Sequence, residues 1–193
     1  MKITNKHNLP PVIIDWIENA NKERQLQVEQ GDFTVTQLLS NPKEQYLLSR
    51  NPDIEVDASK FIAVLSGEAW HTGIAANSTN RRFHGALVEK RFSIKYHGWK
   101  ITGQPDVVDG DYLMDYKEST VGRFAKGVPQ EYENQLNFYH YILSSNGKHP
   151  KFMGIWVKYK DYMPSRAGTN HYPDAAMQYF PVPIWDYDEQ DAF

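Results

Sequence analysis

The segment 103–117 constrains the fold of this chain more than any other stretch. It holds an Asp-Gly pair between two runs of apolar residues, which is a strong signal for a β-hairpin with a two-residue turn. If Gly110 and Asp111 form the turn, Asp106 lies directly opposite Asp115 on the neighbouring strand. Because strand side chains alternate between the two faces of a sheet, Asp115 and Lys117 share one face. The hairpin is therefore expected to gather two carboxylates and an ammonium group in one place.

Two carboxylates that face each other across a strand pair are unfavourable, at a cost of a few tenths to ~1 kcal/mol. A hard divalent cation removes this cost, because Mg²⁺ binds through one or two carboxylates together with water and substrate phosphate. The backbone carbonyl of Tyr116 is a further candidate ligand. Lys117 is placed to orient an attacking water and to offset negative charge on a phosphate. Asp106, Asp115 and Lys117 are thus the candidate catalytic residues of a metal-dependent phosphodiesterase site.

The hairpin residues, in the order Pro-Asp and then Asp-Tyr-Lys, resemble the signature of the PD-(D/E)xK nuclease superfamily. Two further features follow the order seen in its RecB-type branch. His71 lies upstream, near the start of a predicted helix, and Gln135 and Tyr139 lie four residues apart on one face of another. The resemblance covers roughly residues 34–159. It implies that His71 completes the metal shell, and that Gln135 and Tyr139 contact the DNA strand or support the metal ligands.

Three more charged residues are second candidates. Glu89 falls on a predicted strand over Leu87–Tyr96, and the resemblance implies that this strand places an acid near the site. The alternative is a strand-face carboxylate paired with a lysine or arginine. Arg123 and Lys126 follow the hairpin directly and are candidate DNA contacts, with a solvated basic surface as the alternative.

Composition excludes several kinds of site. The chain has no cysteine, so it holds no disulfide, no thiolate zinc site and no cysteine-ligated iron–sulfur cluster. The expected cofactor is therefore one or two ions of Mg²⁺ or Mn²⁺ alone. A net charge of −3 argues against broad wrapping of nucleic acid, although local phosphate contacts remain compatible with it. No apolar run approaches the ~18 residues of a membrane span, and the N-terminus lacks a secretory signal, so a cytoplasmic location is expected.

The order of predicted elements favours an α/β fold, with a mixed central β-sheet flanked by helices. The resemblance implies the same restriction-endonuclease-like core. We expect one domain over residues 1–193, with its core at about 34–160. The expected elements are a helix opened by Pro10 and Pro11, two short helices within Thr34–Arg50, a helix from near Lys60, strands at Leu87–Tyr96 and Phe152–Tyr159, a helix at Glu131–Leu143, and an irregular tail from Met163.

These features together predict a Mg²⁺- or Mn²⁺-dependent DNA nuclease, with an exonuclease that processes DNA ends in recombination or repair as the first choice. The chain has no G-x-x-x-x-G-K-[ST] loop, so any unwinding must come from a partner. Besides DNA, a recombinase, a single-strand annealing protein or a helicase is a candidate partner. The resemblance extends to phage enzymes. A restriction-type or structure-specific endonuclease, and a noncatalytic DNA- or protein-binding module on the same fold, are the alternatives.

Overall fold

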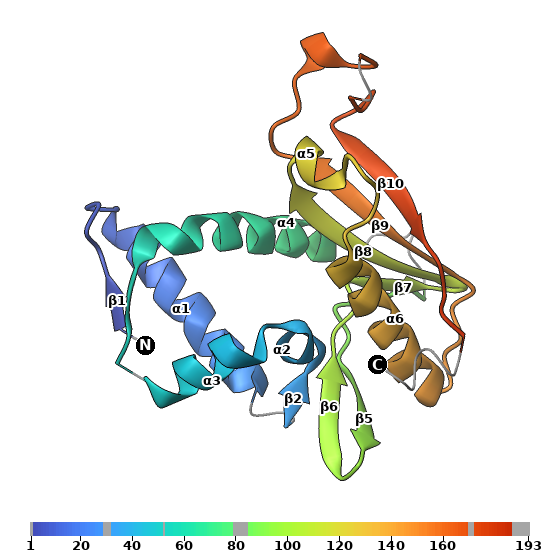
Figure 1. Cartoon of the computed structure of the whole chain (residues 1–193), viewed down its shortest axis with the longest axis horizontal. Helices are drawn as coiled ribbons and strands as arrows, with labels where there is room; N and C mark the ends of the chain where they lie inside the picture. Colours follow the sequence, from blue (N-terminus) through green and yellow to red (C-terminus); the bar gives the residue numbers. More distant parts are fainter. Residues whose placement is uncertain (1, 29–31, 52, 79–84, 170–171, 187–193) are drawn as a thin grey trace.

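A computed structural model describes residues 2–28, 32–51, 53–78, 85–169 and 172–186. The expected α/β class is confirmed, because helices and strands alternate along the described chain. A five-stranded sheet with helix α6 (Gln130–Ser145) forms one part of the molecule, and helix α1 (Pro11–Val28) belongs to the other (Figure 1). Helix α4 (Ile62–Ser78) runs between these two parts (Figure 1). None of the described helices combines the length and the apolar character needed to cross a bilayer.

The five-stranded sheet has the strand order β10-β9-β8-β7-β4. Its strands are β4 (Leu87–Val88), β7 (Val107–Asp109), β8 (Tyr112–Ser119), β9 (Phe152–Tyr159) and β10 (Met177–Val182). Strands β8 and β9 run parallel, whereas the other neighbours run antiparallel, so the sheet is mixed as expected. Strand β9 is most deeply buried on one face, which carries Ile155 and Val157 with no exposed surface.

The predicted hairpin is confirmed in its register. Val107 pairs with Met114 and Asp109 with Tyr112, which leaves a two-residue turn between β7 and β8. Gly110 begins this turn with a φ of 55°, a conformation that glycine adopts without steric cost. Continuing the register by one step places Asp106 level with Asp115, as the sequence predicts.

Helix α6 covers the sheet through one apolar face. Its buried residues are Leu136, Asn137, Tyr139, Ile142 and Leu143, which recur at helical spacing. The helix approaches strand β6 (Trp99–Gly103) closely at Gly103, where an added Cβ would lie 3.0 Å from side-chain atoms of both Tyr139 and Ile142. This close approach fixes the position of α6 beside the end of the hairpin.

The remaining elements are short. A three-stranded sheet contains β2 (Phe33–Thr34), β5 (Phe92–Tyr96) and β6 (Trp99–Gly103), and a two-stranded sheet contains β1 (Lys2–Thr4) and β3 (Glu55–Asp57). The helical pieces are α2 (Val35–Leu39), α3 (Pro42–Arg50), α5 (Val121–Phe124) and the 3-10 turns η1 (Ala58–Phe61) and η3 (Pro164–Arg166). The two short helices expected around Pro42 are therefore present. Thr34 caps α2 through a capping box with Gln37.

The single strand predicted over Leu87–Tyr96 is wrong. The segment forms β4 and β5, which belong to different sheets. Glu89 separates them in a left-handed conformation, with a φ of 46°, so the chain turns there instead of continuing as a strand. Its backbone N–H donates to the carbonyl of Asp106 at 2.9 Å, which holds the turn against the hairpin.

Two further expectations need correction. The tail is not irregular throughout, because β10 adds an antiparallel edge strand to β9. Pro181 lies in this edge strand, where a missing N–H is tolerated. A proline within a segment argues against a strand, so the sequence did not predict β10. His71 lies in the middle of α4 and not near its start, because α4 already begins at Ile62 and ends at Ser78.

Buried apolar residues form two clusters. The larger lies between the five-stranded sheet and α6, and includes Leu113 and Leu136. The smaller joins α1, η1 and the first turns of α4 through Ile17, Ala58 and Leu65. Whether the whole chain behaves as one domain stays a prediction. Helix α4 links the two clusters, since it begins in the smaller one and contacts strand β8.

Asp57 anchors the start of η1 and offers a test of the smaller cluster. Its carboxylate accepts hydrogen bonds from the hydroxyl and N–H of Ser59 and from the N–H of Lys6, which lower its pKa to about 2. Because this pKa lies below the ordinary value of 3.8, the stabilisation is present above about pH 4 and is lost as the pH falls toward 2.

We therefore expect Asp57→Ala to lower the melting temperature at neutral pH, by an amount that shrinks between pH 4 and pH 2. Thermal denaturation at a series of pH values measures this difference against wild type. Asp53→Ala removes an exposed acid nearby and serves as the control. A constant difference at all pH values would contradict the assigned role.

Candidate active site

The sequence-predicted core of the site is brought together where α4, the β7–β8 hairpin and α6 meet. His71 Nδ1 on α4 lies 3.2 Å from Oδ1 of Asp106, just before β7. The other oxygen of Asp106 accepts the backbone N–H of Tyr116 on β8 at 2.7 Å. Asp106 therefore joins the helix to the hairpin, and one carboxylate orients both the imidazole and the β8 backbone.

Asp115 is the most buried acid of the site, with 2% of its surface exposed. Burial raises its pKa to about 6, and the negative charge of Asp106 acts in the same direction, whereas Lys117 opposes the shift. The Lys117 ammonium lies 2.9 Å from Oδ2 of Asp115 and donates a hydrogen bond to Oδ1 at 3.1 Å. The two acids lie close enough for the charge of Asp106 to raise the pKa of Asp115, and the lysine offsets part of their repulsion.

Lys117 is held by more than its acid partner. Its Nζ also donates to Oε1 of Gln135 at 3.0 Å and lies 5.2 Å from the ring centre of Tyr132. Burial alone would lower the pKa of Lys117, but the charges of Asp115 and Asp106 raise it above its usual range. The ammonium is therefore charged at neutral pH and has a fixed direction.

Gln135 and Tyr139 continue this chain of contacts along α6. Gln135 Nε2 donates to the Tyr139 hydroxyl at 3.0 Å, so the amide is bound at both ends. Tyr139 is 6% exposed, and burial raises its pKa to about 12. Of the two roles implied by the sequence, support of the site therefore fits these contacts better than direct contact of Tyr139 with DNA.

Helix α4 is fastened to β8 beside the site. Ser66 on α4 donates to Glu118 on β8 at 2.5 Å, and Lys158 on β9 bonds the same carboxylate at 2.9 Å. The Lys158 ammonium also lies 4.7 Å from the ring of Trp70, one residue before His71. These contacts from two strands fix where the His71 imidazole reaches the hairpin.

The second candidates fall in different places. Glu89 borders a cavity of about 770 Å³ together with His71, so it lies near the site although not on the predicted strand. Arg123 is ion-paired with Glu131 and lies 5.4 Å from the centre of the Tyr132 ring, which Lys117 also contacts. Lys126 is exposed after α5. Arg123 and Lys117 thus contact the same aromatic ring. Contact of Arg123 with DNA stays a prediction.

The donor groups suit a hard divalent cation. Two carboxylates with an imidazole and the Tyr116 carbonyl offer the oxygen-rich mixture that Mg²⁺ and Mn²⁺ accept. Oδ2 of Asp115 is buried and lies 2.9 Å from the Lys117 ammonium, so an ion bound at this oxygen would share it with the lysine. His71 and Asp106 contact each other directly, and no three His, Asp or Glu side chains in the described ranges form a ready shell. Metal binding would replace the direct His71–Asp106 contact with bonds from both groups to one ion.

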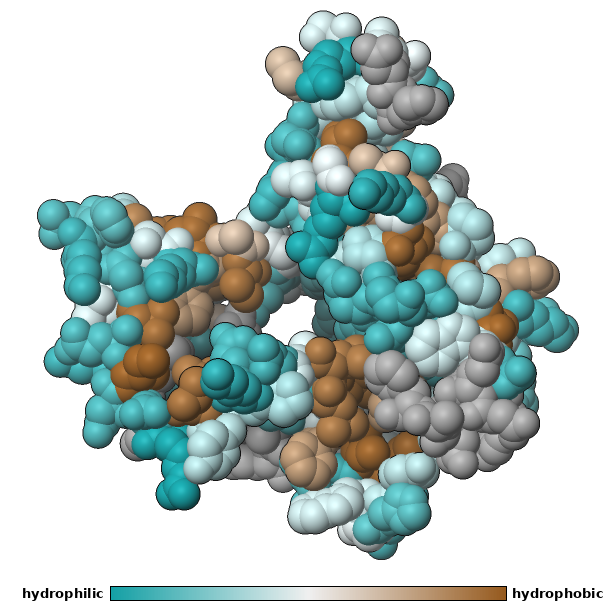
Figure 2. Space-filling view, viewed as in Figure 1, coloured by the Kyte–Doolittle hydropathy of each residue, from teal (hydrophilic) through white to brown (hydrophobic). Residues whose placement is uncertain are grey.

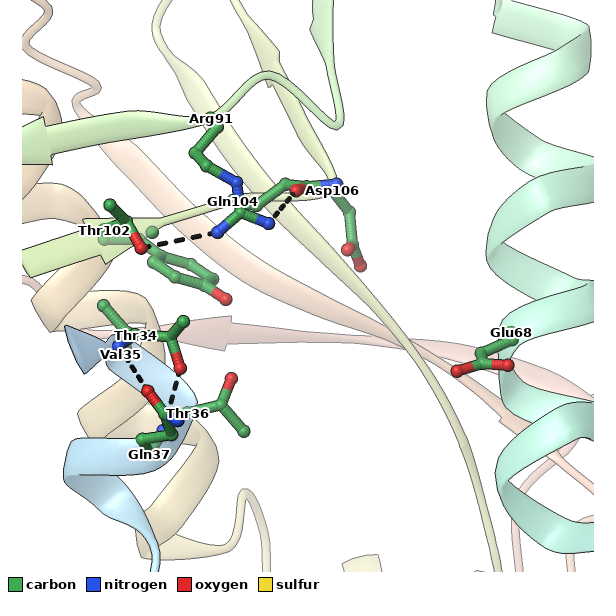
Figure 3. A pocket seen from close by; sticks show the side chains of 11 residues that line it. Thr34, Val35, Thr36, Gln37, Glu68, Arg91, Thr102, Gln104 and Asp106 are labelled. Atoms are coloured by element: carbon green, nitrogen blue, oxygen red, sulfur yellow. Dashed lines mark hydrogen bonds between the residues drawn. The ribbon is translucent and has the colours of Figure 1, made fainter. Parts of the chain in front are cut away.

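Sequence reasoning missed three residues around the site. Tyr132 contacts the cations of both Lys117 and Arg123 through its ring. Gln104 and Arg91 bond each other beside Asp106 (Figure 3). Only Tyr132 carried a local signal, because it precedes Gln135 by three residues on the same helical face. Arg91 could not be found locally, since the turn at Glu89 decides where its side chain points.

Comparison with known proteins supports the fold of the chain and identifies no family. No protein-family model matches the chain, and neither does any curated protein. Among solved structures, the crystal structure of SSO0001 superposes with a TM-score of 0.52 at 19% sequence identity, over 81% of this chain and 69% of that one. At this identity the similarity supports the α/β fold alone.

The buried pair of Asp115 and Lys117 predicts a specific pattern of stability. Lys117→Met keeps much of the side-chain volume but leaves Asp115 buried without its cation, which should cost about 3–5 kcal/mol of unfolding free energy. Adding Asp115→Asn removes the stranded charge, so the double variant should regain part of this loss. Urea denaturation of wild type, both single variants and the double variant, in EDTA at one pH, measures the coupling. Additive effects would show that the two groups do not form a pair in solution.

Proposed function

We propose that this chain is a Mg²⁺- or Mn²⁺-dependent deoxyribonuclease of the RecB-type branch of the PD-(D/E)xK superfamily. The observation that carries the proposal is the convergence of the residues of that signature. Asp106, Asp115 and Lys117 on the hairpin meet His71 from one helix and Gln135 from another. These residues are distant in sequence, so a chance match of letters would not be expected to place them in mutual contact.

Asp106, Asp115, His71 and the Tyr116 carbonyl would hold the ion. A bound Mg²⁺ or Mn²⁺ supplies a nucleophilic hydroxide from water and polarises the phosphoryl oxygen. The two acids also bring a strongly negative patch to the site, which would repel a phosphodiester in the absence of a cation. Substrate binding should therefore depend on a divalent ion as much as the reaction does.

Lys117 would act as a fixed positive charge. Its raised pKa keeps it protonated at neutral pH, so it can donate a hydrogen bond to the attacking water or to a phosphate oxygen but cannot take a proton. Asp115 and Gln135 hold its direction before substrate arrives, which is the kind of preorganisation that lowers the cost of charge development. The ring of Tyr132 adds a cation–π contact to the ammonium at 5.2 Å.

The preferred substrate is a DNA end, which makes the proposed activity exonucleolytic and suits recombination or repair in the cytoplasm of a bacterium or a phage-infected cell. A separate recombinase, annealing protein or helicase would present that end. A restriction-type endonuclease would cut closed circles, and a noncatalytic binding module would cut neither circles nor linear DNA. The three possibilities therefore separate in a single assay.

The assay compares end-labelled linear DNA with covalently closed circular DNA, in Mg²⁺, in Mn²⁺ and in EDTA. Wild type should degrade linear DNA from its ends with either metal, and EDTA should abolish the reaction. Asp115→Asn should lose at least 10²-fold in rate because it removes a ligand charge. Asp109→Asn, on the same hairpin but beside the turn, is the matched control and should retain activity. Metal-independent cleavage, or full activity in Asp115→Asn, would refute the proposal.

Gln135 and Tyr139 should act through Lys117 and not through the substrate. Gln135→Ala frees the ammonium, and Tyr139→Phe removes only the hydroxyl that holds Gln135, so both should lower kcat by about 10–100-fold, the usual cost of losing a supporting contact. DNA affinity should stay close to wild type. Single-turnover rates in Mg²⁺ and binding measured in Ca²⁺ separate the two quantities. A large loss of affinity with kcat preserved would place Gln135 on the DNA instead.

A further inference from the structure

Arg91 is a charged side chain beside the site, and the part of the chain that the structure describes gives it no acidic partner. It is half-buried, and it donates to Oε1 of Gln104 at 2.6 Å and to Oγ1 of Thr102 at 3.4 Å. Among the described residues no carboxylate lies within ion-pair distance of its guanidinium. A guanidinium has five donors in a planar fork, and two neutral acceptors leave donors available to bind an anion.

The space in front of Arg91 is a cavity of about 470 Å³ that also borders Asp106. Figure 3 shows Arg91 and Gln104 extending over this cavity from the strand side, with Asp106 next to them. Glu68 faces them from α4 on the opposite wall (Figure 3). An anion in the cavity would therefore lie on the Arg91 side, away from Glu68 and next to the proposed metal ligand Asp106.

A second cavity continues beyond the site. It has a volume of about 770 Å³, borders His71 and Trp16, and shares Glu68 and Gln104 with the first. The space-filling view shows that the molecule is hollowed between α4 and the hairpin side, in line with these two cavities (Figure 2). The proposed metal ligands Asp106 and His71 therefore border two neighbouring cavities, and the Arg91 guanidinium borders the one that Asp106 lines.

We propose that Arg91 binds a backbone phosphate of the DNA strand being cleaved, namely the phosphate adjacent to the scissile one. This inference rests on the proposed function. The fork of Arg91 matches two phosphate oxygens, and Gln104 holds the guanidinium in place from the strand that leads to Asp106. Arg91 would then fix the register of the strand, so that the next phosphate lies at Asp106, Asp115 and Lys117. Arg91 is thus a positioning residue for the reaction.

Binding of a short single-stranded oligodeoxynucleotide in Ca²⁺ tests this. Arg91→Ala should weaken binding by at least tenfold, the loss of a charge-assisted hydrogen bond. It should also reduce the slope of log affinity against log salt by about 0.7, the value for one phosphate on a single strand. Arg91→Lys keeps the charge without the fork, so it should restore the slope but not the full affinity. Arg166→Ala removes an exposed arginine in the tail and should change neither.

A second set of probes identifies the phosphate. Oligodeoxynucleotides that carry one uncharged methylphosphonate at successive positions should show one position where wild type loses affinity and Arg91→Ala loses none. Equal losses in both proteins at every position, or an unchanged salt slope in Arg91→Ala, would overturn the inference. Thermal melting excludes misfolding, and Arg91→Lys carries the test if Arg91→Ala does not fold.

The cleavage assay separates this inference from the proposed function. If wild type cleaves linear DNA and Arg91→Ala binds and cleaves it equally well, Arg91 does not contact the DNA and the nuclease proposal still stands. If the methylphosphonate probes show a phosphate position that depends on Arg91 but wild type does not cleave DNA, the phosphate site stands and the nuclease proposal is refuted. Absence of oligodeoxynucleotide binding by wild type would overturn the phosphate site itself.

Discussion

The site depends on one buried ion pair at the centre of the sheet. Asp115 on β8 is 2% exposed, and such a carboxylate is tolerated only when a nearby cation and good hydrogen bonds offset its lost hydration. Lys117 supplies the cation from the same face of the strand, and Gln135 on α6 holds Lys117 in turn. The packing of α6 on the sheet therefore helps to hold the Asp115–Lys117 pair in place. Displacement of α6 would remove the hydrogen bond that Gln135 accepts from Lys117.

Those parts of the site that follow local rules could be predicted from the sequence. The Asp-Gly turn sets the register of the hairpin, and the register sets which acids face each other. The alternation of strand side chains places Lys117 beside Asp115, and helical spacing places Gln135 beside Tyr139. Each of these relations spans few residues, so the backbone geometry of one element decides it.

The remaining features depend on contacts between distant segments, which no local pattern encodes. The segment predicted as one strand divides at Glu89, because β4 pairs with β7 whereas β5 pairs with β6. That division carries Arg91 away from a solvated strand face and into the cavity beside Asp106. Strand β10 was likewise missed, since its place is set by pairing with β9 and not by its own composition. The unpredicted residues are therefore those whose direction is decided by a turn or a sheet edge.

The His71–Asp106 contact links the two parts of the molecule through the site. Helix α4 starts in the smaller apolar cluster, where Leu65 is buried, and reaches the hairpin two turns later at His71. Ser66 ties the same helix to β8, so α4 has little freedom to rotate about its axis. An ion held by both His71 and Asp106 would replace a direct contact with two bonds to one centre, and so tie α4 to the hairpin through the metal. Metal binding would then fix the position of α4 relative to the strands, on either side of the cavity that Glu68 and Arg91 border.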